Sequence, residues 1–333
     1  MKKILLILLV GAMIFFTGCQ RTYNKKTFNR PNITDETEAS EIEPEFLTEP
    51  VVEPYTEFHT EATTEPPTEA PTEPPTEPPL INPETGVIVP SYIFTLNNAA
   101  RSAGYDNAGP KDEHNRPLAV ISLQNEYGNP HNTLFIGEDS RKIYLTFVEG
   151  TEYRDSDGVR KTEKLLNILK ENDVKATFFC TGSYIMKNAD LCMRMINEGH
   201  AIGGHGYSHM SGGMALQPVS VQYNDAYQMK KTARKILGIE LKLYRPDYER
   251  FSHQSLAILN EMGFKTVMQS FSYKDYLLNE HPDNEETLNL FKNSIHYGEI
   301  MGLHPLCDTN IEILPDFINY AKEQGYIFDV ISS

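Results

Sequence analysis

The sequence predicts an α/β fold in which parallel strands alternate with helices. Apolar runs of strand composition alternate about seven times with segments that have apolar residues at helical spacing, which is typical of a parallel sheet with right-handed crossovers. Glycines follow four of the helical segments directly before the next strand, where a helix C-cap is expected. On these observations, about 190 residues for seven units fit either an open doubly wound sheet or a closed or incomplete barrel.

The predicted elements lie between residues 143 and 330. The strands are residues 143–147, 176–180, 201–203, 241–244, 266–269, 300–303 and 326–330. Helical spacing is shown by five groups of apolar residues: Leu165, Ile168 and Leu169; Cys192, Met195 and Ile196; Ala226, Met229, Ala233 and Ile236; Leu256, Leu259 and Met262; Leu314, Phe317, Ile318 and Ala321. The capping glycines are Gly199, Gly238, Gly263 and Gly325. Residues 91–142 form a lead-in segment with two further candidate strands, 119–123 and 133–136.

Residues 1–19 have the features of a targeting segment. Two lysines precede a short apolar run, residues 4–16, which is too short to be expected to span a bilayer. The segment ends in Phe-Thr-Gly-Cys at residues 16–19, which resembles a bacterial lipobox. The alternatives are an ordinary cleaved signal peptide and an uncleaved anchor. The lipobox predicts a lipoprotein that is lipidated at Cys19 and held outside the cytoplasm at the cell membrane.

Residues 20–90 have the composition of a linker. Between Thr64 and Pro79 the chain repeats Thr-Glu-Pro-Pro with one alanine replacement, and residues 31–90 hold fifteen acidic residues and no lysine or arginine. Because proline blocks helices and sheets and like charges repel, we predict a disordered, extended spacer. At the polyproline II rise, ~50 such residues reach on the order of 150 Å, enough to hold an anchored domain within the cell wall.

The rest of the chain is only mildly acidic. Residues 91–333 contain 24 basic and 31 acidic side chains, a net charge of −7. A nucleic-acid partner would require a basic patch, so the charge argues against one. Cys180, Cys192 and Cys307 also lie here. Their odd number excludes a complete disulfide framework, and we predict buried small hydrophobes, with their free or disulfide state left open.

Reactive side chains follow the predicted strands at their carboxyl ends. In chain order they are Glu149, His205, His209, Arg245, Asp247, Asp275 and His304. The carboxyl ends of parallel strands form the face on which such folds carry their chemistry, so a functional site is predicted there. Polar residues without a common role would scatter over both ends of the sheet.

Two histidines and a glutamate are predicted to hold a divalent metal, with zinc as the default. His205 and His209 are four residues apart, so one helical turn would point both imidazoles the same way. Glu149 is a plausible third ligand, which leaves open positions for water and substrate. The alternative is two histidines satisfied elsewhere. His304 is either a buried histidine with a backbone partner or a general acid whose pKa Asp275 raises.

Taken together, the motifs between Thr146 and His304 resemble the polysaccharide deacetylase family, carbohydrate esterase family four with the NodB-homology domain. The similarity covers residues 127–331, and residues 143–147, 270–273 and 324–328 are similar to segments of peptidoglycan de-N-acetylases from spore-forming bacteria. The resemblance implies a distorted (β/α) barrel of about seven strands over residues 143–333. It also implies metal-dependent hydrolysis of the acetamide of N-acetylated cell-wall glycan.

The resemblance also implies a role for each site residue. Glu149, His205 and His209 would hold the metal. Arg245 would orient the base, and the backbone amide of Tyr248 would face the oxyanion. Asp275 would adjust the pKa of the general acid, His304. From the residues alone, Arg245 is either a fixed cation at the rim or is salt-bridged to Glu249 or Asp247.

The sequence departs from the family pattern at several site positions. Val148 stands where the family has its general base, and valine cannot take a proton from the attacking water; base catalysis is worth ~10²–10⁴ in rate. The other departures replace proline by Asp247, glycine by Glu249, a hydroxyl residue by Gly206, tryptophan by Tyr276 and an aromatic residue by Gln269. Two hypotheses follow. Either the protein is an active de-N-acetylase in which Asp247, Glu149 or Glu152 replaces the base, or it is a pseudo-deacetylase that binds glycan or a protein partner without turnover.

Overall fold

The computed structural model describes residues 89–102, 108–278 and 281–332, all within one unit of the chain, Glu73–Ser333. The predicted targeting segment, its Cys19 and the linker up to residue 88 lie outside the described residues. Within the described ranges, no helix combines the length and apolar character that a bilayer-spanning helix requires.

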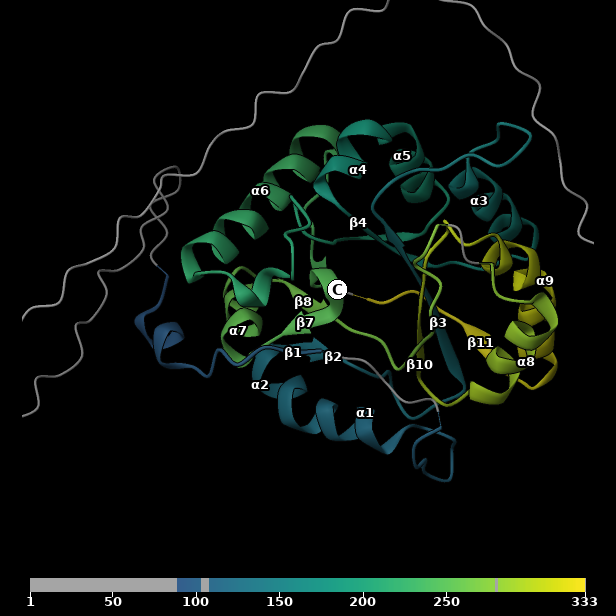
Figure 1. The fold of residues 1–333 in the computed structure, drawn as a ribbon, viewed down its shortest axis with the longest axis horizontal. Helices are drawn as coiled ribbons and strands as arrows, with labels where there is room; N and C mark the ends of the chain where they lie inside the picture. The colour runs from purple at the N-terminus through teal and green to yellow at the C-terminus, as the bar shows by residue number, and fades with distance from the viewer. Residues whose placement is uncertain (1–88, 103–107, 279–280, 333) are drawn as a thin grey trace, which may run out of the picture. The chain divides into compact units, whose positions relative to one another are not determined.

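A parallel sheet forms the centre of the described residues (Figure 1). Its order is β2-β8-β6-β5-β4-β3-β10-β9, with β11 also pairing with β3. The strands are β2 Thr133–Leu134, β3 Lys142–Glu149, β4 Thr177–Cys180, β5 Ala201–Gly204, β6 Leu243–Tyr244, β8 Lys265–Val267, β9 Phe271–Ser272, β10 Glu299–Leu303 and β11 Ile327–Phe328. A separate antiparallel pair joins β1 Arg101–Ser102 to β7 Arg250–Phe251. Every pairing of the main sheet is parallel, which confirms the predicted fold class as a distorted, half-barrel form of the (β/α) barrel.

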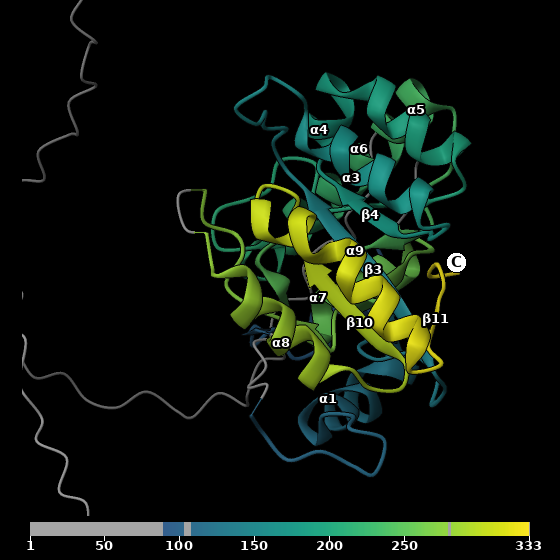
Figure 2. The ribbon, with the colours of Figure 1, turned by 90° about the vertical axis from the view of Figure 1, so that its right-hand side faces the viewer.

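Helices surround this sheet, as Figures 1 and 2 show from two directions. They are α1 Leu118–Leu123, α2 Asn129–His131, α3 Lys161–Glu171, α4 Gly182–Lys187, α5 Ala189–Asn197, α6 Val219–Leu237, α7 His253–Glu261, α8 Asn284–Ser294 and α9 Asp308–Glu323. The five helical segments predicted from apolar spacing correspond to α3, α5, α6, α7 and α9. The capping prediction is also confirmed, because Gly199, Gly238, Gly263 and Gly325 all have positive φ, between 70° and 84°.

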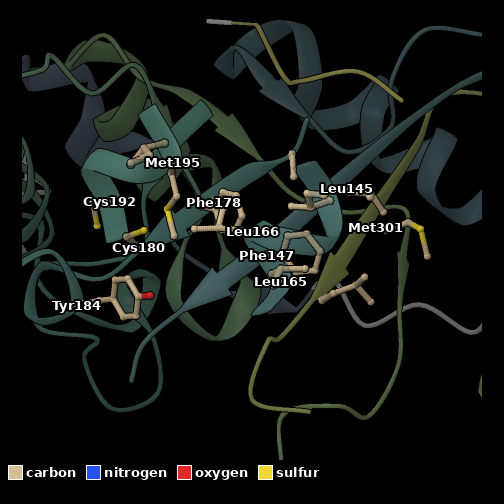
Figure 3. Packing of buried hydrophobic residues seen from close by; sticks show 14 of the residues in the cluster. Leu145, Phe147, Leu165, Leu166, Phe178, Cys180, Tyr184, Cys192, Met195 and Met301 are labelled. Carbon is tan, nitrogen blue, oxygen red and sulfur yellow. The ribbon is translucent and has the colours of Figure 1, made fainter. Parts of the chain in front are cut away.

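The apolar core fixes the position of β3, the strand that leads into the site. Phe147 of β3 stacks on Phe178 of β4 with ring centroids 5.5 Å apart, and Leu165 and Leu166 of α3 pack in the same cluster (Figure 3). Full burial of one such side chain stabilises the fold by roughly 1.5–3 kcal/mol. All residues of β3 except Lys142 are buried, which explains its continuous apolar run.

One predicted strand in the lead-in segment is wrong. Residues 119–123 belong to α1, in which the N–H groups of Val120 and Ile121 donate to the carbonyl of Pro117. Five consecutive apolar residues do not distinguish a strand from a helix, and only Val120 of this helix is buried. The second lead-in strand exists in shorter form as β2, Thr133–Leu134. The cysteine prediction is confirmed: Cys180, Cys192 and Cys307 are buried, and all three are free thiols.

Candidate active site

The predicted site residues come together at the carboxyl ends of the strands. Phe147 of β3 pairs with Leu303 of β10, so Val148 and His304 continue these neighbouring strands side by side. A cavity of about 860 Å³ opens at this end. Its lining includes Val148, Glu149, His205, His209, Tyr248, Asp275 and His304. Two predicted residues, Arg245 and Asp247, are outside this lining; both follow β6 and are completely buried.

The two imidazoles lie next to each other, but on a loop. Their ring centroids are 5.2 Å apart, and the backbone leaves helical geometry at Gly206 and His209, with φ of 76° and 48°. The predicted shared helical turn is therefore wrong. Instead, the carboxylate of Asp225 on α6 accepts hydrogen bonds from the backbone N–H groups of Tyr207 (2.8 Å) and Ser208 (3.0 Å), which hold the loop in place.

His205 has the local environment of a metal-binding histidine. Its Nδ1 lies 3.0 Å from the carbonyl oxygen of Arg245, which fixes the ring and leaves Nε2 with its lone pair. Burial, and then neighbouring His209, lower the pKa of His205 well below its ordinary value. The imidazole is therefore neutral near pH 7, which is the form that binds a metal.

Glu149 does not join this pair in the structure. Its Oε1 accepts a hydrogen bond from the hydroxyl of Thr162 (3.1 Å), and burial followed by the charge of Glu152 raise its pKa well above the ordinary value. Among the described residues, no three His, Cys, Asp or Glu side chains lie close enough together to hold a metal ion. The imidazole pair fits a metal, whereas the full site with Glu149 as third ligand stays a prediction.

His304 and Asp275 form a hydrogen-bonded dyad. The Asp275 carboxylate accepts from Nδ1 of His304 (2.8 Å), from the His304 backbone N–H (2.8 Å) and from Nδ2 of Asn310 (2.7 Å). Burial alone would lower the pKa of His304, but the charge and hydrogen bond of Asp275 outweigh it and raise the pKa. The dyad therefore keeps a proton on a ring that lines the cavity, as a general acid requires.

Arg245 is an internal cation and not one exposed at the rim. Its Nε–H and Nη2–H groups donate to the carbonyls of Val267 (3.0 Å) and Met268 (2.8 Å), and its guanidinium lies 4.3 Å from the ring centroid of Phe179. Two residues after it, Asp247 is fully buried and accepts from the N–H of Met214 (2.8 Å). Arg245 thus ties the segment after β6 to the carboxyl end of β8.

The next two residues have an unusual backbone. Tyr248 and Glu249 have φ of 55° and 53°, in the left-handed region that favours glycine. Half of the Tyr248 side chain is exposed, and its ring centroid lies 5.0 Å from that of His209. Glu249 belongs to the cavity lining, and Nε2 of buried Gln269 donates to its carboxylate. The predicted role of the Tyr248 amide toward an oxyanion stays a prediction.

Some functional contacts could not be found from the sequence. Asn310 on α9 holds Asp275 and also accepts from the hydroxyl of Tyr273 (2.5 Å). Tyr184 on α4 donates its hydroxyl to Glu152 (2.8 Å), which also lines the cavity. No motif or spacing marks these partners, because each contact joins segments that are distant in the chain.

Comparisons with known proteins agree with this fold. A family model for polysaccharide deacetylase matches residues 136–267. The peptidoglycan-N-acetylmuramic acid deacetylase PdaA of Bacillus subtilis is 31% identical over 220 residues, which cover 66% of this chain and 80% of the relative. A 30.6 kDa protein of Geobacillus stearothermophilus is 33% identical with the same coverage. The solved structure of Bacillus subtilis PdaA, a family 4 carbohydrate esterase, covers 71% of this chain and 96% of its own, with TM-score 0.62 and 27% identity.

The chain thus combines a parallel half-barrel with a cavity at the carboxyl ends of its strands that is lined by titratable side chains. It belongs to the polysaccharide deacetylase family, and its curated relatives include peptidoglycan deacetylases.

Proposed function

We propose that this protein binds N-acetylated sugars of cell-wall peptidoglycan in the cavity and removes their acetyl groups. The observation that carries this proposal is the His304–Asp275 dyad, hydrogen-bonded at 2.8 Å within the lining of a cavity that also holds two histidines. Bacillus subtilis PdaA, by its name a peptidoglycan-N-acetylmuramic acid deacetylase, supports the substrate class.

The dyad suits the second half of amide hydrolysis. Once water has added to the acetamide carbonyl, the C–N bond breaks only if the leaving nitrogen receives a proton. His304 carries that proton because Asp275 raises its pKa, and the bond from Nδ1 to Asp275 leaves Nε2 as the nitrogen that donates it. The His205–His209 pair supports binding of a divalent metal, with zinc as the default, and such an ion would polarise the acetamide carbonyl.

The sequence supports a position outside the cytoplasm. The lipobox at residues 16–19 would place lipid on Cys19 and anchor the protein to the cell membrane. The acidic, proline-rich linker, residues 20–90, would then extend the domain into the cell wall, where its glycan substrate lies.

A second candidate function is binding of cell-wall glycan without turnover. The observation that favours it is Val148, which lines the cavity at the position of the family's base and is 9% exposed. Its isopropyl group cannot accept a proton. The two candidates predict different fates for the acetyl group, although both place the same sugar in the cavity.

The two candidate functions are separated by measuring acetate release from purified N-acetylated peptidoglycan fragments, with and without added zinc. The deacetylase proposal expects acetate from the native chain and none from His304→Ala, while the exposed His281→Ala serves as the matched control. If the protein binds glycan without turnover, the native chain should bind the fragments but release no acetate. Acetate should then appear only with the Val148→Asp variant. The control for that change is Val221→Asp, at an exposed position on α6.

A further inference from the structure

We propose that Glu249 supplies the carboxylate that Val148 lacks and accepts the proton of the attacking water. This inference rests on the deacetylase function proposed above. It assigns the base to a different segment of the chain, the loop after β6 in place of the end of β3.

Glu249 lies where a base can work with the acid. It lines the same cavity as His205, His209 and His304. Burial raises the pKa of the Glu249 carboxyl, the charges of Arg245 and His304 lower it, and Asp275 raises it, so the carboxylate is electrostatically coupled to the acid dyad and to the buried arginine. A base and an acid that serve one amide bond must reach the same reacting centre from two sides, and this position allows that.

Its side chain is held in place by a partner that is also unusual. Nε2 of Gln269, two residues after β8, donates a hydrogen bond to a carboxylate oxygen of Glu249. The resemblance to the family implies glycine at 249 and an aromatic residue at 269, so two departures from the pattern form one contact. The hydrogen bond orients one carboxylate oxygen and leaves the other to accept a proton.

The backbone at this position would suit glycine better. Glu249 and Tyr248 are consecutive residues with φ near +55°, a region in which a side chain raises the energy and glycine does not. A glutamate that occupies such a position keeps its carboxylate in the cavity despite the local strain. If this turn had only a structural role, glycine would be the more stable residue at position 249.

The other carboxylates near the cavity are less suitable. Glu149 accepts a hydrogen bond from the Thr162 hydroxyl and is already the predicted third metal ligand, and Glu152 accepts two hydrogen bonds, from the Thr162 backbone N–H and the Tyr184 hydroxyl. Asp247 is completely buried, is bonded to the N–H of Met214, and is not part of the cavity lining. These are the three residues that the sequence offers as replacements for the base, and their observed contacts favour Glu249 over each of them.

The proton balance of the reaction closes with these residues. Glu249 takes a proton from water as the water oxygen forms a bond to the acetamide carbon and the carbonyl electrons move onto oxygen. The C–N bond then breaks as those electrons return, and His304 protonates the leaving nitrogen. The products are acetate and a free amine. Glu249 returns its proton to solvent and His304 regains one, so no oxidant, reductant or further reactant is needed.

The test compares Glu249→Gln with the native full-length chain by steady-state acetate release from N-acetylated peptidoglycan fragments. The amide keeps the shape and the contact with Gln269 but cannot accept the proton, so kcat should fall by ~10²-fold or more with little change in KM. Glu323→Gln, on the exposed end of α9, is the matched control and should retain the native rate. The double variant Val148→Asp/Glu249→Gln should recover at least ~10-fold of the lost kcat, because it restores a base at the family position.

Three results would overturn the assignment, and they are distinguishable. If the native chain releases acetate and Glu249→Gln does so at the same kcat, Glu249 is not the base, while the proposed deacetylase function stands. If the native chain releases none under conditions in which Val148→Asp does, both the function and the role of Glu249 fail. Glu249→Gln could also lose kcat, fail to recover it when Val148→Asp is added, and unfold at a lower urea concentration than the native chain. That result would show that Glu249 has a structural role and would refute the proton transfer.

Discussion

Replacing Asp275 by asparagine should destabilise the folded protein by ~3 kcal/mol. The carboxylate is 1% exposed and accepts three hydrogen bonds of 2.7–2.8 Å, two of them from His304. Hydrogen bonds to charged groups contribute ~1.5–3 kcal/mol each, and breaking one partner out of a buried ion pair costs ~3–5 kcal/mol. Asparagine keeps one acceptor and turns an amide donor toward existing donors. We expect the lower part of this range, because the His304 side chain is 22% exposed.

Urea unfolding of the native chain and the Asp275→Asn variant measures this difference as a change in the midpoint at constant slope. The chain offers a matched control in Asp139, whose Oδ1 also lies 2.8 Å from a histidine nitrogen, Nδ1 of His114. Those two side chains are 45% and 36% exposed, so Asp139→Asn should cost no more than ~1 kcal/mol. Equal losses in the two variants would refute the claim that burial makes the Asp275 dyad strong.

The stabilising effect of the dyad should also depend on pH in a defined direction. Burial opposes the proton on His304, but Asp275 raises the folded pKa above the unfolded value. The resulting stability is complete below the unfolded pKa of histidine and is lost as the pH rises through the folded pKa. The difference between native and Asp275→Asn should therefore be larger at about pH 6 than at about pH 9. A constant difference across that range would show that His304 does not carry the proton.

Three further predictions concern other parts of the chain. Gly298→Ala should lower the free energy of unfolding by ~2–3 kcal/mol, since φ is 68° and a Cβ would collide with backbone atoms of Gly137 and Glu138; a urea midpoint within error of the native one would contradict this. Ser252→Ala should cost ~1 kcal/mol in the same assay by removing the capping box of α7, and no loss would show that the cap is dispensable. His205→Ala should abolish zinc binding measured by elemental analysis after dialysis, and unchanged stoichiometry would exclude the imidazole pair as the metal site.

Features that depend on short stretches of sequence could be predicted well. The positive φ of Gly199 or Gly325 follows from a helix that must stop before a strand. The end of the helical spacing and the start of the next strand lie within a few residues of each glycine. The gathering of polar residues at one end of the sheet follows in the same way, because the carboxyl ends of parallel strands share an edge. Residues 119–123 fail for the opposite reason: their apolar run is consistent with two structures, and the choice depends on contacts elsewhere.

Contacts between distant segments set the limit for the site itself. The helical-turn prediction for His205 and His209 used their spacing alone, whereas Asp225, sixteen residues after His209, determines the loop that holds them. The same limit applies to Glu149, whose carboxylate turns toward Thr162 and not toward the imidazoles. Spacing can therefore nominate ligands, but it cannot decide which of two nearby partners a buried carboxylate bonds to.

This limit matters most for judging whether catalysis is lost. In the sequence, Val148, Glu249 and Gln269 are three separate departures, and each one counts against activity. In the folded protein, buried Gln269 bonds to Glu249, and Glu249 lines the same cavity as Val148. If no other carboxylate compensated for Val148, the site would keep Arg245 and the general acid His304 but would have no general base. The carboxylate of Glu249 lines this cavity together with His304 and is electrostatically coupled to Arg245 and His304, which makes relocation of the base a better account of these substitutions than independent decay.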